Sequence, residues 1–336
     1  MLAPEPKGAT MRRREFIAIL CGAAGWPIAV HGQQRDKIPR VGFLGLTSPA
    51  AHARFLEAFR RGLRDLGYID GESISVEYRW AEGQYDRLPQ LATDLIHEKV
   101  DLVVTYGSEG ALAAKRSITT VPVVAVAVGD FVGAGVVTNL PRPEANITGL
   151  SLLATELSEK RLSLLRDTLP QLGKVAVLWN PGNASVALKF KSAEAAARSL
   201  GIQVLDLKYS SLAELTRAIS AAAQAGADAL FTADDFLLVA HATQTAVLAR
   251  EFRLPLVSEF REIAEAGGLW SYGPDLRDIY RRAATFVDKL LKGATPGSLP
   301  VEQPTKFEFV INLQTARLIG LKLSPALLAR ADEVIE

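Results

Sequence analysis

The sequence has one cysteine, Cys21, among 336 residues. Cys21 lies inside a segment with the pattern of an export signal, so the mature chain has no thiol. This excludes disulfide bonds, a cysteine nucleophile and cysteine-ligated metals from the mature protein. We expect no lipid anchor either, because Leu20 stands where a lipoprotein signal needs a small residue.

The motifs of several enzyme classes are also missing. There is no G-x-S-x-G elbow, no Walker A loop, no H-E-x-x-H motif and no G-x-G-x-x-G loop. The histidines outside the export segment, His52, His97 and His241, fall within helical patterns that favour packing or solvated positions. No base is placed beside a nucleophile. We therefore expect no catalytic residues, no metal site and no cofactor.

The chain also lacks an excess of charge of one sign. Its formal charge is +1, and the export segment carries a surplus of +2, which leaves about −1 for the rest. Such a balance offers no basic surface to nucleic acid. With 49% hydrophobic and 22% charged residues, the composition is typical of a soluble globular protein of one or two domains.

Residues 1–32 have the pattern of an export signal. "MRRREF" is a basic start, "FIAILCGAAGWPIAV" is an apolar stretch of 15 residues, and "VHG" offers a cleavage site. Met11 is an alternative start. The stretch is shorter than the ~20 residues of a membrane span. The paired arginines fit the twin-arginine route, with the general route as the alternative. Both routes predict a periplasmic protein.

Short β-rich runs alternate with amphipathic helical patterns after residue 38. Helical patterns such as 51–67 and 189–201 end at a glycine suited to a left-handed cap, and a further helix is expected over 236–251. Strands buried on both faces that alternate with helices predict parallel βαβ units. The expected strands are 40–46, 74–80, 101–107, 121–128, 174–180, 203–209, 228–233 and 254–259.

An internal repeat divides the chain. "VGFLGLTSPA" at Val41 matches "VAVLWNPGNA" at Val175, and in both cases a Leu-Gly pair ends the next helix, its glycine 26 residues on. The residues from Asp101 likewise match those from Asp228. The predicted fold class is therefore α/β, with two similar doubly wound parallel-sheet lobes joined by a multi-crossover hinge. The predicted division is 38–146 plus 272–302 for the N-terminal lobe and 147–271 plus 303–336 for the C-terminal lobe.

Ligands of open parallel sheets bind where the carboxyl ends of the strands lead into helix starts. Hydroxyl and backbone N–H groups at those starts suit an anion such as a carboxylate, whereas Asp234 and Glu259 suit an amine. Ser48 and Ser108 could instead be only helix caps, and Asn180 could only form a turn. The candidate ligand-binding residues are Thr47, Ser48, Gly107, Ser108, Asp130, Asn180, Asp234, Glu259 and Tyr272.

The adjacent acids Asp234 and Asp235 invite a catalytic or metal-binding interpretation. Neighbouring residues at a strand end point in different directions, so the two cannot easily share a proton or chelate one ion. At least one of them must cap the helix that follows. The pair therefore points to two separate roles.

Several long stretches resemble a known family. The carriers are "RRREFI", "EYRWAEGQYDRLPQLA", "AGGLWSYGPDL" and "LPVEQPTKFEFVINLQTARLIGL". They are similar to substrate-binding proteins of bacterial ABC transporters with the type I periplasmic fold, in the branch that includes binders of tryptophan and related amino acids. The resemblance implies a small polar ligand such as an amino acid, an ABC permease in the inner membrane as partner, no nucleic acid and no catalysis. We also expect a monomer.

The resemblance also implies roles for single residues. It places Ser48, Ser108 and Asp130 of the first lobe and Asn180, Asp234 and Glu259 of the second along the cleft. It assigns ligand contact to Asp234 and a place in the first helical turn to Asp235.

Two other functions are open at this point. An exported α/β enzyme would use Asp234 with Asp130 or Glu259 as an acid/base pair. A transcription regulator of the same fold would need a helix-turn-helix at the N-terminus, where the export pattern stands instead.

Overall fold

The computed structural model describes residues 38–143, 146–153, 157–233 and 235–336. The predicted export signal and the predicted ligand residue Asp234 lie outside these residues. The strands are β1 (Arg40–Gly45), β2 (Ser75–Trp80), β3 (Leu102–Tyr106), β4 (Val123–Val128), β5 (Ile147–Ser151), β6 (Lys174–Trp179), β7 (Gln203–Lys208), β8 (Ala229–Ala233), β9 (Leu256–Ser258), β10 (Trp270–Pro274), β11 (Phe307–Asn312) and β12 (Glu333–Ile335).

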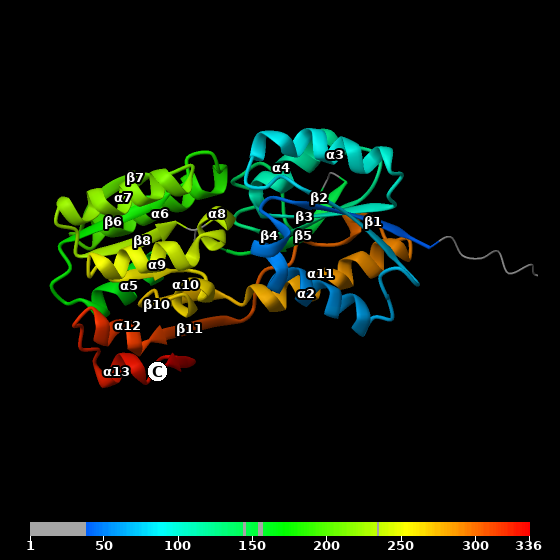
Figure 1. Cartoon of the computed structure of the whole chain (residues 1–336). Helices are drawn as coiled ribbons and strands as arrows, with labels where there is room; N and C mark the ends of the chain where they lie inside the picture. The colour runs from blue at the N-terminus through cyan, green and yellow to red at the C-terminus, as the bar shows by residue number, and fades with distance from the viewer. Residues whose placement is uncertain (1–37, 144–145, 154–156, 234) are drawn as a thin grey trace, which may run out of the picture. The chain divides into compact units, whose positions relative to one another are not determined.

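Helices connect these strands and cover both sheets (Figure 1). They are α2 (Pro49–Asp65), α3 (Leu88–His97), α4 (Gly107–Ser117), α5 (Leu157–Thr168), α6 (Ala184–Ser199), α7 (Leu212–Gln224), α8 (Phe236–Ala240), α9 (Ala242–Glu251), α10 (Arg261–Glu265), α11 (Leu276–Leu291), α12 (Leu313–Leu318) and α13 (Pro325–Leu328). The 3-10 helices are η2 (Tyr85–Arg87) and η3 (Pro296–Ser298).

The first lobe is built on five parallel strands in the order β2-β1-β3-β4-β5. Strands β3 and β4 are buried along their whole length, which explains their runs of valine and alanine without polar alternation. Helices α3 and α4 cover one face of this sheet, and α2 and α11 cover the other (Figure 1).

The second lobe repeats this arrangement. Its sheet has the order β12-β11-β10-β9-β8-β6-β7, in which β7-β6-β8-β9-β10 reproduces the strand order of the first lobe. Strand β11 runs antiparallel to β10, and β12 runs parallel to β11. The predicted fold class, two similar doubly wound parallel-sheet lobes, is confirmed.

In the second lobe, successive side chains of β6 point alternately into two hydrophobic clusters, one on each face of the sheet. Val175 and Val177 of β6 pack in the cluster that includes side chains of α5 and α6. Ala176 and Leu178 point to the opposite face and pack with α7 and α9. Because β6 is apolar on both faces, helices must cover both sides, and the loops remain to carry polar groups.

The sequence prediction of the lobe boundary is corrected by the strand pairing. It assigns residues from 147 onward to the C-terminal lobe, but β5 pairs with β4 in the first sheet. The strand predictions omit β5 because Gly149 interrupts a short run. Gly149 has a φ of 152°, and a Cβ there would lie 1.8 Å from the carbonyl oxygen of Ala125.

Two more elements differ from the predictions. Strand β10 is absent from the predicted strands because its Gly-Pro end has the pattern of a turn. The helix predicted over 236–251 is two helices, α8 and α9, which meet at His241 with non-helical dihedral angles.

Helix α11 returns to the first lobe after β10 and packs along α2. Gly62 of α2 lies at this contact. A Cβ at Gly62 would lie 2.2 Å from the carbonyl oxygen of Arg281 and 2.9 Å from the Cβ of Ala284. Because Gly62 has no side chain, α2 and α11 can pack closely, and this contact holds α11 against the first lobe.

We expect Gly62→Ala to lower the free energy of unfolding by up to about 2 kcal/mol. Overpacking against α11 outweighs the ~1 kcal/mol by which alanine is favoured over glycine within a helix. The control Arg61→Ala changes the preceding position, which is exposed, and should shift the same free energy by less than about 0.5 kcal/mol. Urea unfolding followed by circular dichroism measures both. A stabilised Gly62→Ala protein would contradict the close contact.

Candidate functional site

Two helix starts from different lobes meet at a small inner cavity. Helix α4 begins directly after β3, where Gly107 adopts a φ of 66° that favours glycine. Helix α6 begins after the turn that follows β6. The inner cavity between them has a volume of about 20 Å³. It is lined by Gly107, Ser108, Ala127, Gly129, Leu152, Asn183, Ser185, Val186, Lys189, Asp235, Phe236 and Phe260.

Side chains link the two helix starts across the lobes. The Oγ atoms of Ser108 and Ser185 lie 2.6 Å apart, and both side chains are buried. The carboxylate of Glu109 accepts a hydrogen bond from the backbone N–H of Ala184, with 3.1 Å between the heavy atoms. The start of α6 thus binds a carboxylate group that the opposite lobe supplies, as expected for a helix N-terminus with its positive dipole end.

The start of α4 has less internal capping than the start of α6. Asn183 caps α6 by accepting a hydrogen bond from the backbone N–H of Val186, at 3.3 Å. The residue before α4 is Tyr106, whose side chain forms no capping hydrogen bond. An anion at the inner cavity would therefore meet backbone N–H groups at α4 that no side chain caps.

Buried charges support the cavity from the second lobe. Lys189 lines the cavity and donates a hydrogen bond to the carboxylate of Glu259. Arg161 lies 3.5 Å from the other oxygen of this carboxylate. All three side chains are almost completely buried, so the charges are held by one another. Glu259, predicted as a ligand residue, thus contacts the cation that reaches the cavity.

Asp235 caps α8 and lines the same cavity. Its carboxylate accepts hydrogen bonds from the backbone N–H of Leu238 (3.0 Å), the side-chain amide of Asn180 (2.7 Å) and the hydroxyl of Tyr209 (3.1 Å). Burial raises the pKa of Asp235, and these hydrogen bonds oppose the increase. The expectation that Asp235 supports the start of this helix is confirmed.

Three of the predicted residues, Thr47, Ser48 and Asp130, do not line the cavity. Thr47 bonds through its hydroxyl and its backbone N–H to the hydroxyl of Tyr106, at 2.9 Å each. Ser48 caps α2 by accepting from the N–H of Ala51. Asp130 accepts from the N–H groups of Val132 and Gly133, which closes its own turn.

Asn180 and Tyr272 are also bonded or packed within the protein. Besides its contact with Asp235, Asn180 accepts from the N–H of Gly182 at 2.9 Å. Tyr272 lies in β10 and stacks on Phe307, with 6.4 Å between the ring centroids. Of the predicted ligand residues that the structure describes, Gly107 and Ser108 line the inner cavity directly.

The prediction omits Ser185, Lys189 and Phe260, which line the cavity. Ser185 stands in the first turn of α6, and Lys189 stands one turn later on the same side of that helix. The repeat identifies the "NPGNAS" stretch, which ends at Ser185. Including one more turn of the following helix among the candidate residues would add Lys189.

An aromatic wall closes the inner cavity on one side. The ring of Tyr106 meets the ring of Phe236 edge-on at 4.7 Å, and Phe236 stacks on Phe260 at 6.1 Å. Behind them His52 stacks on Tyr106 at 3.8 Å. Burial lowers the pKa of His52 to about 3, so this imidazole is neutral at pH 7 and serves as part of the packing.

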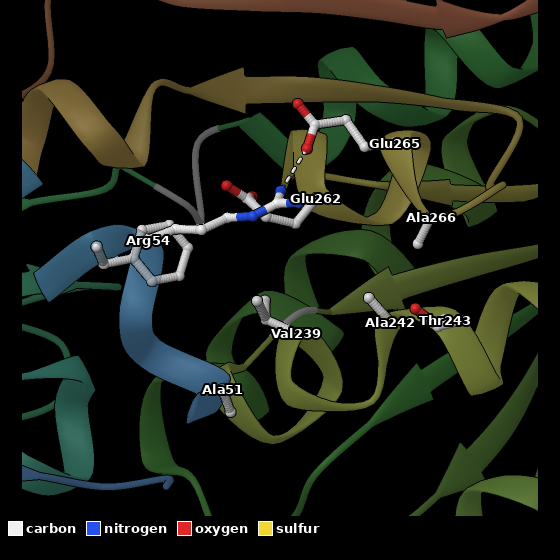
Figure 2. Close-up of a pocket in the computed structure, with 9 residues that line it drawn as sticks. Ala51, Arg54, Val239, Ala242, Thr243, Glu262, Glu265 and Ala266 are labelled. Atoms are coloured by element: carbon white, nitrogen blue, oxygen red, sulfur yellow. Dashed lines mark hydrogen bonds and ion pairs between the residues drawn. The ribbon is translucent and has the colours of Figure 1, made fainter. Parts of the chain in front are cut away.

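A second, outer cavity lies beyond this wall, with a volume of about 300 Å³. Figure 2 shows the charged side chains of Arg54, Glu262 and Glu265 on one side of the outer cavity, and Val239, Ala242 and Thr243 on the other. Arg54 of α2 and Glu265 of α10 form an ion pair of 2.7 Å between the lobes.

Metal binding and membrane crossing find no support in the described residues. Within 38–143, 146–153, 157–233 and 235–336, no group of three or more His, Cys, Asp or Glu side chains is arranged to hold a metal ion. Among the helices of the same residues, none combines the length and the apolar character that a membrane crossing requires.

Asp235 caps a helix and also accepts hydrogen bonds from buried donors. We expect Asp235→Ala to lower the free energy of unfolding by about 2–4 kcal/mol, since it removes a cap worth ~1 kcal/mol and leaves buried donors without their acceptor. Ser211→Ala removes an exposed cap of α7 and should cost only ~1 kcal/mol. Urea unfolding compares the two. Equal losses would show that the contacts with Asn180 and Tyr209 add nothing.

Glu262 should make the free energy of unfolding depend on pH. Burial raises the pKa of Glu262 to about 7. Because the folded protein holds this proton more tightly than the unfolded chain, its stabilising effect is complete below pH ~4.5 and disappears as pH rises through about 7. We expect the free energy of unfolding of Glu262→Gln, relative to wild type, to rise by about 2–3 kcal/mol between pH 5 and pH 8. Ser199→Ala changes an exposed side chain that does not titrate, and it should show no such trend in urea unfolding at both pH values.

Comparison with known proteins agrees with this architecture. The family model described as "ABC transporter substrate binding protein" matches residues 43–335. A protein named "Tyrosine-binding protein" from Clostridioides difficile (strain R20291) is 25% identical over 266 residues, which are 79% of this chain and 76% of that protein.

Solved structures also match most of this chain. A conserved domain protein from Vibrio cholerae is 28% identical and superimposes with a TM-score of 0.84 over 89% of this chain and 100% of that chain. An ABC domain in complex with L-Trp from Streptococcus pneumonia is 22% identical, with a TM-score of 0.82 and the same coverage of both chains.

Proposed function

Because this chain belongs to the family of ABC transporter substrate-binding proteins, we propose that it captures a free amino acid at the inner cavity. One observation carries the proposal: the start of α6 already binds a carboxylate, that of Glu109. A ligand carboxylate of the same geometry would bind between the starts of α4 and α6, with Ser108, Ser185 and Lys189 around it.

The ammonium group of such a ligand would lie toward Asp235. A carboxylate can accept about four hydrogen bonds, and Asp235 accepts three from the residues that the structure describes. Asp234, the neighbouring acid, is proposed as a second contact. In this arrangement Glu259 positions Lys189, while Thr47, Ser48, Asp130, Asn180 and Tyr272 support the loops from behind.

We propose an aromatic amino acid as the substrate class. Phe236 and Phe260 line the cavity and offer their rings to an aromatic side chain. The protein from Clostridioides difficile named for tyrosine and the structure from Streptococcus pneumonia that contains L-Trp support the same class.

Binding requires the lobes to separate. A volume of about 20 Å³ holds about one water molecule, far less than an amino acid needs. Separation would break the contacts Ser108–Ser185 and Glu109–Ala184. The ligand carboxylate would then take the place of Glu109 at α6, and the lobes would close on the ligand.

The rest of the proposal concerns the setting of the protein. The export pattern of residues 1–32 supports a periplasmic receptor that delivers its ligand, as a monomer, to an ABC permease of the inner membrane. The acid/base alternative receives less support, because Asp130 closes its own turn and Glu259 is paired with Lys189 and Arg161.

We expect the purified protein to bind L-tyrosine or L-tryptophan in titration calorimetry, and to bind tyramine at the L-tyrosine site about 100-fold more weakly than L-tyrosine, as measured by displacement of L-tyrosine. Tyramine keeps the ring and the ammonium group but lacks the carboxylate, whose charge-assisted hydrogen bonds are worth about 1.5–3 kcal/mol each. Equal affinity for L-tyrosine and tyramine would refute carboxylate recognition. The absence of binding by any aromatic amino acid would refute the substrate class.

A matched pair of variants tests the position of the site. Ser185→Ala should weaken amino-acid binding about 10-fold, because it removes one hydroxyl at the proposed carboxylate site. Ser199→Ala makes the same change at an exposed position of the same helix and should leave the affinity as it is. Equal affinities of the two variants would place the ligand elsewhere.

A further inference from the structure

Of the two glutamates that line the outer cavity, Glu265 is paired with arginines and Glu262 forms no ion pair within the described residues. Arg54 pairs with one oxygen of Glu265 at 2.7 Å, and Arg261 pairs with the other at 2.9 Å. Both oxygens of Glu265 therefore face an arginine. Glu262 projects from the same helix and also lines the cavity, and within the described residues no ion pair is formed by its carboxylate.

Glu262 is the unusual group of this cavity. It is 9% exposed, and its Oε2 atom accepts no hydrogen bond from the residues that the structure describes. A buried carboxylate with one oxygen that accepts no hydrogen bond is unfavourable, and proteins offset the cost by pairing it with a cation or by keeping its proton. The structure thus presents one buried acid at a cavity large enough for a small molecule.

We propose that the outer cavity is a second binding site, which takes a small organic cation with an ammonium group on an apolar tail. The ammonium group would pair with Glu262. The tail would lie against Phe55, Val239, Ala242 and Ala266, which supply the apolar wall. A volume of about 300 Å³ lies at the lower end of small-molecule sites.

The donor set argues for an organic cation over a metal ion. Calcium takes six to eight oxygen ligands, and magnesium demands an octahedron of them. Here the oxygens of Glu265 are engaged by two arginines, and most of the remaining wall is apolar. An ammonium group needs fewer acceptors, and its hydrocarbon part gains from apolar contact.

The outer site is separate from the inner cavity. The two sets of lining residues share no member. Phe55 lines the outer cavity and Phe236 the inner one, and these rings meet edge-on with 6.3 Å between their centroids. An amine in the outer site and an amino acid in the inner site would therefore bind without displacing each other.

The surroundings of Glu262 give the proposed site a pH dependence. Burial raises the pKa of Glu262, so the carboxyl holds its proton near neutral pH, and an ammonium ion must release that proton on binding. The charged and titratable groups near it are Arg54 from α2, Arg261 and Glu265 from α10, and Arg277 and Tyr280 from α11.

The test uses benzylamine as the probe and benzyl alcohol as its neutral counterpart. Binding of each is measured by titration calorimetry of the full chain, once without an amino acid and once saturated with L-tyrosine. We expect saturable benzylamine binding in both states, tighter at pH 8 than at pH 6, with proton release at pH 6 in buffers of different ionisation enthalpy. Benzyl alcohol should bind at least 10-fold more weakly.

Three variants locate the probe. Glu262→Gln keeps the shape of the side chain and should weaken benzylamine binding at least 10-fold. Thr243→Trp keeps Glu262 but fills the cavity from an exposed position and should also weaken it. Glu57→Gln lies on α2 outside the cavity lining and should leave it unchanged.

Two results would overturn the outer site. One is benzylamine affinity that is the same in wild type, Glu262→Gln and Thr243→Trp. The other is competition between benzylamine and the amino acid, which would place both in one cavity. Failure of amino-acid binding alone would refute the proposed function and leave the outer site standing, because benzylamine binding is measured without the amino acid as well.

Discussion

Parallel strands impose the constraint on which the rest of the structure depends: each helix that follows a strand begins at the same edge of its sheet. Because both sheets use the order 2-1-3-4-5, each lobe gathers its helix starts at one edge. Backbone N–H groups at these starts have no partner within their helices and must find one elsewhere. Ser48, Asn183 and Asp235 provide such partners at α2, α6 and α8, whereas α4 has no side-chain cap and α6 receives the carboxylate of Glu109 from the other lobe. The proposed anion site between the lobes thus depends on where the topology places the starts of α4 and α6.

The buried charges of the second lobe are held in place by partners from other segments. Glu259 holds Lys189 and Arg161, and Asp235 is held by donors from three separate segments. Removing one partner of such a group is costly, because the remaining charge stays buried. These contacts therefore fix where Lys189 and Asp235 meet the inner cavity. Glu262 lacks this support within the described residues, and burial raises the pKa of Glu262 as a result.

The sequence predicts the architecture better than it predicts the contacts. Alternating strands and helices and the repeat from Val41 and Val175 are local patterns, and they suffice for two doubly wound lobes. Strand β5 escapes prediction because Gly149 shortens its apolar run, although pairing with β4 stabilises it. Ser108 is predictable as a residue at a helix start. Glu259 and Lys189 are 70 positions apart in the sequence. No local sequence pattern therefore shows whether Glu259 pairs with that lysine or binds a ligand.

The contacts between the lobes set how much free energy a ligand must supply. The pair Arg54–Glu265 has an arginine whose side chain is 69% exposed, so it contributes about 1 kcal/mol at most. The hydrogen bond Ser108–Ser185 adds about 1 kcal/mol, and the charge-assisted hydrogen bond Glu109–Ala184 adds about 1.5–3 kcal/mol. Burial of Phe236 against Tyr106 of the first lobe adds about 1.5–3 kcal/mol. Separating the lobes therefore costs a few kcal/mol before solvation and motion of the freed lobes are counted. A ligand between the lobes displaces some of these contacts, so it must replace them with contacts of its own to both lobes for the closed state to remain favoured. A ligand that bound the open and closed states equally well would not shift the equilibrium between them.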